Sequence, residues 1–365
     1  MKNIKKLLAL VLVLVMALSI TACHPKDEVA LSLGDYKITS AVYLTALISA
    51  EQDAKNRAYE NASAMGITLS TDEDYYGQAI DGKDFKDYVK DTALELCKQY
   101  LALDKLLAEG KYKLSDEVKA EADQIANDYW NNYGLNVLYE ANGISFETYK
   151  KTVIYSQMAS EYFVSLYGEG GSKAVSKDEI VKAINSNYVL AYVLQGSYSS
   201  SMTDTEKTAL KKEFAGYKTD IEAGKKTFKE IYVAYNKITD EVLKEAEKGE
   251  AGVDRPSDVF ATIIGGSKTS NPNENFAAIY TMKKDEMKLL ETDSGYNLVI
   301  RLDILEDGYY TKQLTEEILG ILKNEEHTKE IEAYTAALEV KVNNFAIDRF
   351  KVEDIVTTSD LQTLY

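Results

Sequence analysis

The spacing of the apolar residues changes once along this chain, and that change limits the folds it can adopt. Up to about residue 187 apolar side chains recur every three or four positions, as at Val118, Ala122 and Ile125, which is the spacing of a helix lying on a core. The run Tyr188–Leu194 is instead β-branched and aromatic, and Tyr296–Leu302 repeats that pattern. The sequence therefore predicts an α+β protein in which helices precede a part that contains strands.

Capping residues and glycines give the expected limits of the helices. Thr39, Ser115 and Ser145 are each placed to begin a helix, and Ser176 and Thr203 each open a capping-box sequence. The expected segments are a helix from Ser40 to about Ala62, a polar break from Ser63 to Lys83, a helix from Phe85 to Glu109, a long loop over residues 249–275 and a helix from about Leu314 to Val342.

The first 23 residues have the pattern of a bacterial lipoprotein signal. Lysines precede an apolar segment, Leu7–Ile20, which at about 14 residues is too short to span a bilayer as a helix. Ile20-Thr21-Ala22-Cys23 follows and resembles a lipobox, in which Cys23 is acylated and becomes the new N-terminus. Two acyl chains suffice for stable anchoring. An ordinary signal peptide with a chance cysteine at the cut is the alternative.

Charge and cysteine content limit the partners and the chemistry. The net charge of −17 becomes −20 once the three lysines of the signal are removed, which disfavours nucleic acid and anionic lipid surfaces and favours basic clients. After acylation of Cys23 only Cys97 remains, so no intramolecular disulfide is expected. Cys97 lies in a helical pattern without a nearby histidine and is expected to be a small core residue.

Several segments resemble the foldase lipoproteins of the PrsA and SurA type. Val29–Thr39 is similar to the opening strand and turn of that family, "V-A-x-V-x-G-x-x-I-T", and Asn142–Tyr149 is similar to a later part of its helical domain. Residues 188–304 resemble a parvulin-type prolyl isomerase domain. Within them, Lys284–Met287 stands at the "K-x-G-E-[IV]" turn and Glu291–Val299 stands at "x-T-x-x-G-Y-H-I-I".

The resemblance implies a helical chaperone lobe, like that of SurA and trigger factor, completed by a C-terminal helix and interrupted by a parvulin-like α/β lobe. The implied organisation is a signal peptide (1–22), an N-terminal helical chaperone domain (23–185), a degenerate parvulin-like domain (186–308) and a C-terminal helix that packs on the N-terminal lobe (309–365).

The parvulin-like segment lacks the histidines that its family uses. In that family two histidines and a Cys or Asp surround an apolar proline slot. Here Tyr192 or Val193 stands where the first histidine belongs, and Asn297 stands at the second. His24 and His327 lie elsewhere in the chain and do not replace them. Tyr192 and Asn297 are therefore expected to mark a degenerate isomerase site, and no catalytic residue is assigned with them.

Other catalytic and metal-binding patterns are missing from the sequence. It contains no phosphate-binding glycine loop, no His-Glu-x-x-His and no zinc-type cysteine pair. Asp72-Glu73-Asp74 offers oxygen ligands but lacks EF-hand spacing, so neither a metal nor a cofactor is expected. Of the 27 tyrosines, Tyr129, Tyr133 and Tyr162 are candidates for binding unfolded clients, because an amphipathic ring packs on apolar segments at low entropic cost.

These features together predict a lipid-anchored protein on the extracytoplasmic face of the cell membrane. The expected function is a chaperone or foldase that binds unfolded or nascent secreted polypeptides, without efficient prolyl isomerase catalysis. An active prolyl isomerase is the first alternative, and a solute-binding or envelope-structural lipoprotein is the second. Nucleic acid is not expected as a partner, and a homodimer stays open.

Overall fold

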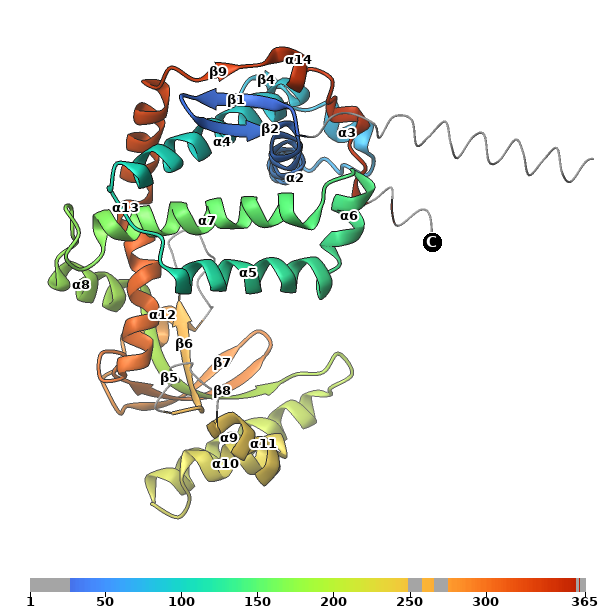
Figure 1. The fold of residues 1–365 in the computed structure, drawn as a ribbon. Helices are drawn as coiled ribbons and strands as arrows, with labels where there is room; N and C mark the ends of the chain where they lie inside the picture. The colour runs from blue at the N-terminus through green and yellow to red at the C-terminus, as the bar shows by residue number, and fades with distance from the viewer. Residues whose placement is uncertain (1–26, 249–257, 266–274, 359–360, 362–365) are drawn as a thin grey trace, which may run out of the picture. The chain divides into compact units, whose positions relative to one another are not determined.

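The computed structural model describes residues 27–248, 258–265, 275–358 and 361, and the chain forms two compact units. Unit 1 combines the residues up to 172 with those from 325 onward, and unit 2 is residues 173–324. Unit 1 is mainly helical, whereas unit 2 is built on a sheet (Figure 1), so the expected mixture of helices and strands is confirmed. Cys23 and the rest of the signal lie outside the described residues.

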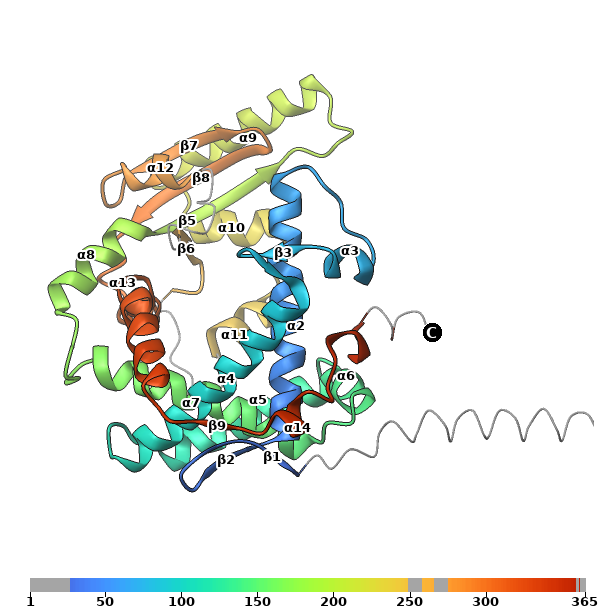
Figure 2. The same ribbon diagram turned by 90° about the horizontal axis from the view of Figure 1, so that it is seen from above.

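Unit 1 joins the two ends of the chain in one small sheet. Strand β1 pairs with β2 on one side and with β9 on the other, both antiparallel (Figure 2). The elements are β1 (Val29–Leu33), β2 (Tyr36–Thr39), α2 (Ser40–Ala64), α3 (Asp72–Tyr76), β3 (Ala79–Ile80), β4 (Lys83–Asp84), α4 (Phe85–Ala108), α5 (Asp116–Asn131), α6 (Leu135–Ala141), α7 (Phe146–Tyr167), β9 (Lys341–Val342), α14 (Asn344–Ile347) and a 3-10 turn, η1 (Val352–Asp354).

The predicted helix starts of unit 1 are confirmed. The side chains of Thr39, Ser115 and Ser145 each accept a hydrogen bond from the backbone N–H three residues later. This bond satisfies one of the N–H groups that a helix start leaves without a partner. The polar break after α2 is also confirmed, although it contains α3 and the hairpin β3–β4. Asp81 and Gly82 turn that hairpin with φ of 51° and 78°, values that glycine adopts without strain.

The core of unit 1 lies among α2, α4, α5 and α7. Leu47, Phe85, Cys97 and Leu101 have no exposed surface, and Trp130 is 7% exposed. Cys97 is therefore the core residue that its sequence context predicts. Burial raises the pKa of its thiol, which keeps the thiol protonated and unreactive at neutral pH.

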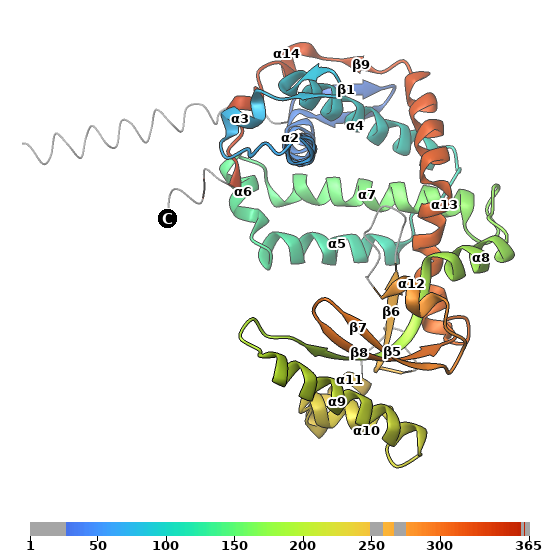
Figure 3. The same ribbon diagram turned by 180° about the vertical axis from the view of Figure 1, so that it is seen from behind.

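Unit 2 is an antiparallel sheet with helices on both faces (Figure 3). The strand order is β6-β5-β8-β7. The elements are α8 (Lys177–Asn187), β5 (Tyr188–Ser197), α9 (Asp204–Glu222), α10 (Phe228–Asn236), α11 (Asp240–Lys248), β6 (Ala261–Gly265), α12 (Phe276–Tyr280), β7 (Met287–Thr292) and β8 (Gly295–Leu302). Both predicted strands are present, and the capping boxes at Ser176 and Thr203 begin α8 and α9 as predicted.

Each face of this sheet carries its own apolar cluster. Leu194 and Leu298 pack on one face with Phe214 of α9 and Phe228 of α10. On the opposite face a second cluster brings together residues of β5, β6, β8, α12 and the segment that follows α12: Val189, Ala191, Ile264, Val299, Ile279 and Met282. Because side chains alternate along a strand, β5, β7 and β8 each contribute to both clusters.

The prediction of a loop over residues 249–275 is wrong for residues 261–265, which form β6. This strand pairs with β5 from Tyr188↔Gly265 to Tyr192↔Ala261. Its five residues include Thr262, Ile263 and Ile264, which suit a strand, but the surrounding Gly, Ser and Asn residues obscure the short run. The rest of the predicted loop is largely outside the described residues.

The last long helix, α13 (Gly308–Ala336), differs from its prediction in extent and in packing. It starts six residues earlier and ends six residues before the predicted end at Val342, because Lys341 and Val342 pair with β1 as β9. The unit boundary at 324/325 falls inside the helix. Leu314 and Ile318 are buried against Ile184 and Tyr188 of unit 2.

The second half of α13 belongs to unit 1. Ile331 and Tyr334 pack against Leu103, Leu106 and Met158. The expected boundaries at 185/186 and 308/309 therefore differ from those of the compact units, at 172/173 and 324/325. Helical periodicity shows that a face needs an apolar partner but does not identify the partner. Within the described residues, none of the helices has the length and apolar character that crossing a bilayer requires.

Candidate functional site

A pocket of about 520 Å³ lies beside the sheet of unit 2. Its lining comes from β5, α10, β6, the residue before α12, and β8: Val193, Gln195, Ser197, Tyr232, Asn236, Thr262, Ile264, Asn275 and Asn297. These side chains supply amides, hydroxyls and aliphatic groups, and no carboxylate, imidazole, thiol or amine is among them. The pocket is thus suited to bind uncharged groups by hydrogen bonds and apolar contact rather than to transfer protons.

Asn297 gives this pocket a buried hydrogen-bond acceptor. The residue is 5% exposed, and its side-chain oxygen Oδ1 is buried without a hydrogen-bond partner. Leaving such a group unpaired costs about 1–3 kcal/mol. The carboxamide oxygen is therefore available to an N–H donor that enters the pocket.

The register of β5 and β8 decides which side chains lie on the same face as Asn297. Gln195 is directly opposite Asn297, and Val193 is directly opposite Val299. Residues two apart along a strand share a face. Val193 and Asn297 therefore lie together in the pocket, whereas Tyr192 points to the other face of the sheet. Of the two residues that the sequence places at the first histidine position, only Val193 lines the pocket.

Tyr192 instead takes part in a polar contact on the opposite face. Its ring stacks on Phe228 with centroids 5.0 Å apart, and its hydroxyl donates to the carboxylate of Asp258. Lys229 pairs with the same carboxylate at 2.7 Å. Burial alone raises the pKa of Asp258, but the bonds from Lys229 and Tyr192 outweigh it and lower that pKa. Burial and the bond to Asp258 raise the pKa of Tyr192. These contacts tie β5 to α10.

Tyr129 and Tyr133 form an exposed aromatic pair at one end of unit 1. Their rings stack with centroids 5.0 Å apart, and the two residues are 47% and 72% exposed. Tyr133 also lines a groove of about 400 Å³ whose surface is mostly apolar. The other lining residues are Gly134, Leu135, Val137, Leu138, Thr358 and Leu361. The pair can thus offer apolar surface together with two hydroxyls.

Tyr162 lies apart from this pair and is partly buried. Its ring packs near Tyr112 and His327, at centroid distances of 5.5 Å and 5.7 Å. It also contacts the apolar cluster that includes Met158. The structure therefore does not bring the three candidate client-binding tyrosines together, and Tyr162 serves packing within unit 1.

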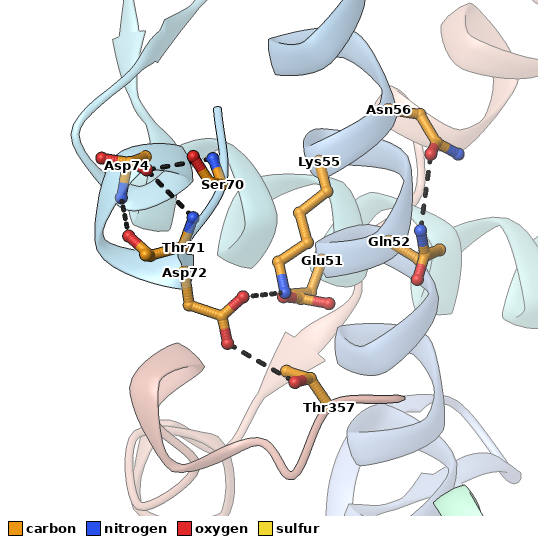
Figure 4. Close-up of polar contacts among 9 residues, drawn as sticks. All are labelled: Glu51, Gln52, Lys55, Asn56, Ser70, Thr71, Asp72, Asp74 and Thr357. Atoms are coloured by element: carbon orange, nitrogen blue, oxygen red, sulfur yellow. Dashed lines mark hydrogen bonds and ion pairs between the residues drawn. The ribbon is translucent and has the colours of Figure 1, made fainter. Parts of the chain in front are cut away.

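The acidic segment Asp72-Glu73-Asp74 is used for local structure (Figure 4). The carboxylate of Asp72 pairs with Lys55 at 2.7 Å and accepts a hydrogen bond from Thr357. Asp74 accepts from the backbone of Ser70 and Thr71 and completes the capping box of α3. These bonds lower the pKa of Asp74. Two of the three carboxylates are thus occupied by contacts within the chain.

Sequence reasoning missed several residues of the unit 2 pocket. The predicted strand ends at Leu194, whereas β5 continues to Ser197 and adds Gln195 and Ser197 to the lining. Tyr232 and Asn236 are four positions apart on α10, a spacing that places both on one side of a helix. That spacing was a usable signal, but nothing in the sequence alone shows that this side of α10 borders the sheet.

The chain is similar in structure to several solved foldases. A foldase protein PrsA from Lactococcus lactis matches at 14% identity, covering 87% of this chain and 96% of that chain, with a TM-score of 0.39. The foldase protein PrsA from Streptococcus pneumoniae matches at 16% identity, over 76% and 96% of the two chains, with a TM-score of 0.38. The peptidylprolyl isomerase PrsA from Bacillus anthracis matches at 16% identity, over 68% and 99%, with a TM-score of 0.22.

Neither a protein-family model nor a curated protein matches the sequence. All three TM-scores lie below 0.5.

Proposed function

We propose that this chain is an extracytoplasmic chaperone or foldase, anchored to the membrane through Cys23, that binds unfolded secreted polypeptides without efficient prolyl isomerase catalysis. The single observation that carries the proposal is the pocket of unit 2. It combines a buried, unpaired acceptor on Asn297 with an uncharged lining. Such a lining recognises a polypeptide's amide and apolar groups and leaves its covalent bonds unchanged.

The surface of unit 1 supports the same function by a second contact. The Tyr129–Tyr133 pair and the adjoining groove expose apolar area that an extended client segment can cover. The chain's net negative charge attracts basic clients and keeps a complex of chaperone and client soluble. Both properties suit loose binding of many different sequences.

An active prolyl isomerase is the competing function, because Val193 and Ile264 give the pocket apolar walls. Rotation about an X–Pro bond has a barrier of about 18–20 kcal/mol, and desolvation of the amide lowers such a barrier. The family's two histidines are replaced here, so catalysis would depend on pocket shape and desolvation. A solute-binding or envelope-structural lipoprotein is the remaining alternative.

Two assays on one client separate these functions. The full chain in detergent is added to a secreted protein whose refolding is limited by proline isomerisation, and both aggregation and the slow refolding phase are followed. We expect suppressed aggregation and an unchanged slow phase. An accelerated slow phase that is lost in Asn297→Ala would identify an enzyme, and no effect in either assay would favour the structural or solute-binding alternative.

A matched pair of tyrosine variants tests the contribution of unit 1. Tyr133→Ser removes the most exposed ring of the pair and is expected to weaken aggregation suppression severalfold. Tyr59→Ser is the control, because Tyr59 is 56% exposed on α2 but does not line the groove. Equal loss, or no loss, in the two variants would remove the groove from the proposed client-binding surface.

Anchoring is tested separately by cell fractionation. Cys23→Ser is expected to move the protein from the membrane fraction to the medium, since the acyl acceptor is gone. Mass spectrometry of the parent protein is expected to show a diacylglyceryl group on Cys23. Identical partitioning of parent and variant would contradict the anchor.

A further inference from the structure

Strand β5 is longer than its neighbour β6, so β6 covers only the first part of one edge of β5. Its ladder with β6 ends at Tyr192↔Ala261, whereas its ladder with β8 continues to Ser197↔Gly295. In the part of the chain that the structure describes, no strand pairs with residues 193–197 on the β6 side. This stretch is therefore a short open edge of the sheet.

The hydrogen bonding of β5 shows which backbone groups face that edge. The N–H of Tyr198 donates to the C=O of Ser294 at 2.7 Å, so Tyr198 points its backbone groups toward the β8 side. These directions alternate along a strand. The N–H and C=O groups of Gln195 and Ser197 consequently point to the open edge. Both residues are exposed, and no bond between described residues uses these groups on that side.

The open edge lies beside the unit 2 pocket. Val193, Gln195 and Ser197 contribute their side chains to the pocket, while their backbone runs along the edge. The unpaired Oδ1 of Asn297, on the residue directly opposite Gln195, lies in the same pocket. A strand edge whose donors and acceptors have no partner among the described residues and a pocket with a buried acceptor are two independent observations. A ligand that presents peptide groups can form hydrogen bonds both with the strand edge and with the acceptor in the pocket.

We propose that an extended segment of an unfolded polypeptide adds to the Gln195–Ser197 edge of β5 as a further strand. One side chain of this segment enters the unit 2 pocket. There an N–H group of the segment donates a hydrogen bond to Oδ1 of Asn297. This inference rests on the proposed chaperone function and specifies how the client is held. Hydrogen bonds to backbone groups do not depend on the side chains of the client, which suits a protein that binds many unfolded polypeptides.

Charge favours a client over a second copy of this chain at the edge. Two copies would bring together like net charges of −17 for the full sequence, and these repel. The pocket lining is uncharged, so it places no charge requirement on the entering segment. A secreted polypeptide that is neutral or basic therefore meets the smaller electrostatic barrier.

A pair of peptides tests backbone pairing directly. The probe is the fluorescein-labelled peptide Lys-Thr-Val-Thr-Val-Thr-Val-Thr-Lys, and its twin carries an N-methyl group on every valine and threonine, so neither of its edges offers an N–H donor. Binding to the full chain in detergent is measured by fluorescence anisotropy. We expect the N-methylated twin to bind at least tenfold more weakly, because each lost hydrogen bond weakens binding severalfold.

Two variants at one position separate backbone from side chain. Gln195→Pro removes an N–H that faces the open edge, so it removes no ladder bond to β8 and suits an edge strand. We expect this variant to bind the probe at least fivefold more weakly. Gln195→Ala keeps the N–H and is expected to bind within about twofold of the parent. Asn297→Leu is expected to weaken binding while leaving the far-UV circular dichroism unchanged.

Several outcomes would overturn the inference. Equal binding of the two peptides to the parent would show that side chains alone hold the client, even if Gln195→Pro fails to fold. A concentration-dependent dimer that Gln195→Pro abolishes, together with no peptide binding, would assign the edge to a second copy. If the parent still suppresses aggregation in either case, the strand-addition inference fails and the proposed function stands. If the parent also fails to suppress aggregation, both the strand-addition inference and the proposed chaperone function are wrong.

Discussion

Replacing Ile318 by alanine tests which unit holds the first half of α13. Ile318 has no exposed surface and packs in a cluster with Ile184, Tyr188 and Leu314 of unit 2. Removing a buried isoleucine side chain to Ala costs about 2–5 kcal/mol, through lost transfer free energy and the cavity left behind. A domain of this size is stable by about 5–15 kcal/mol, so the loss is a large fraction of the stability of unit 2.

The matched control lies one turn further along the same helix. Leu322 is 40% exposed, so Leu322→Ala removes less buried surface and is expected to cost less than about 1 kcal/mol. Both variants change a branched aliphatic residue to Ala in α13, and both alter helix propensity in the same direction. A difference between them therefore reports burial against unit 2 and not the helix itself.

Urea unfolding with two probes assigns the effect to a unit. Trp130 is the only tryptophan and is buried in unit 1, so its fluorescence follows that unit, while far-UV circular dichroism follows both. Ile318→Ala is expected to lower a circular-dichroism midpoint by about 1–2 M urea and to leave the fluorescence midpoint in place. A fluorescence midpoint that falls by the same amount would refute the division of the chain at residue 324. Equal effects of Ile318→Ala and Leu322→Ala would refute the buried contact.

Three further predictions concern unit 2. Gly196→Ala is expected to destabilise by about 1–3 kcal/mol in urea unfolding, since its new Cβ would lie 2.5 Å from a buried ring, whereas Gly216→Ala on an open face of α9 should stabilise by up to about 1 kcal/mol. Asp258 has a lowered pKa in the fold, so its contribution to stability is present above pH about 4 and lost as the pH falls further; Asp258→Asn should flatten that part of a Tm–pH curve. Gln195→Cys with Asn297→Cys should form a disulfide on oxidation, detected by mass. The Cβ atoms of directly opposed residues lie close enough for the two sulfur atoms to bond.

The helices of this chain were predictable because their signals are local. A hydroxyl residue at the start and apolar residues three or four apart define an amphipathic helix without reference to the rest of the fold. Ser115 and α5 are an example, since cap and periodicity agree with the structure. Cys97 was predictable for the same reason, because its neighbours in α4 set the buried face.

Partners across long sequence separations were not predictable in this way. Residues 341–342 were predicted to end the last helix, although Leu338, Val340 and Val342 alternate with charged residues as in a strand; they pair with β1, more than 300 residues earlier. Leu314 and Ile331 lie on one continuous helix but pack in different units. Local sequence specifies that such residues are buried, while the choice of partner depends on the assembled fold.

In the candidate site, the sequence alone could not decide whether Tyr192 or Val193 lines the pocket. The resemblance to parvulin-type domains places the first histidine position at Tyr192 or Val193, and neighbouring strand residues point to opposite faces. Only pairing with β8 decides between them: it puts Val193 on the pocket side with Asn297 and sends Tyr192 to Asp258. In the correspondence that this resemblance implies, the two histidine positions hold the aliphatic Val193 and the amide Asn297. A pocket so lined offers hydrogen bonds and apolar contacts but lacks a proton donor or acceptor of suitable pKa.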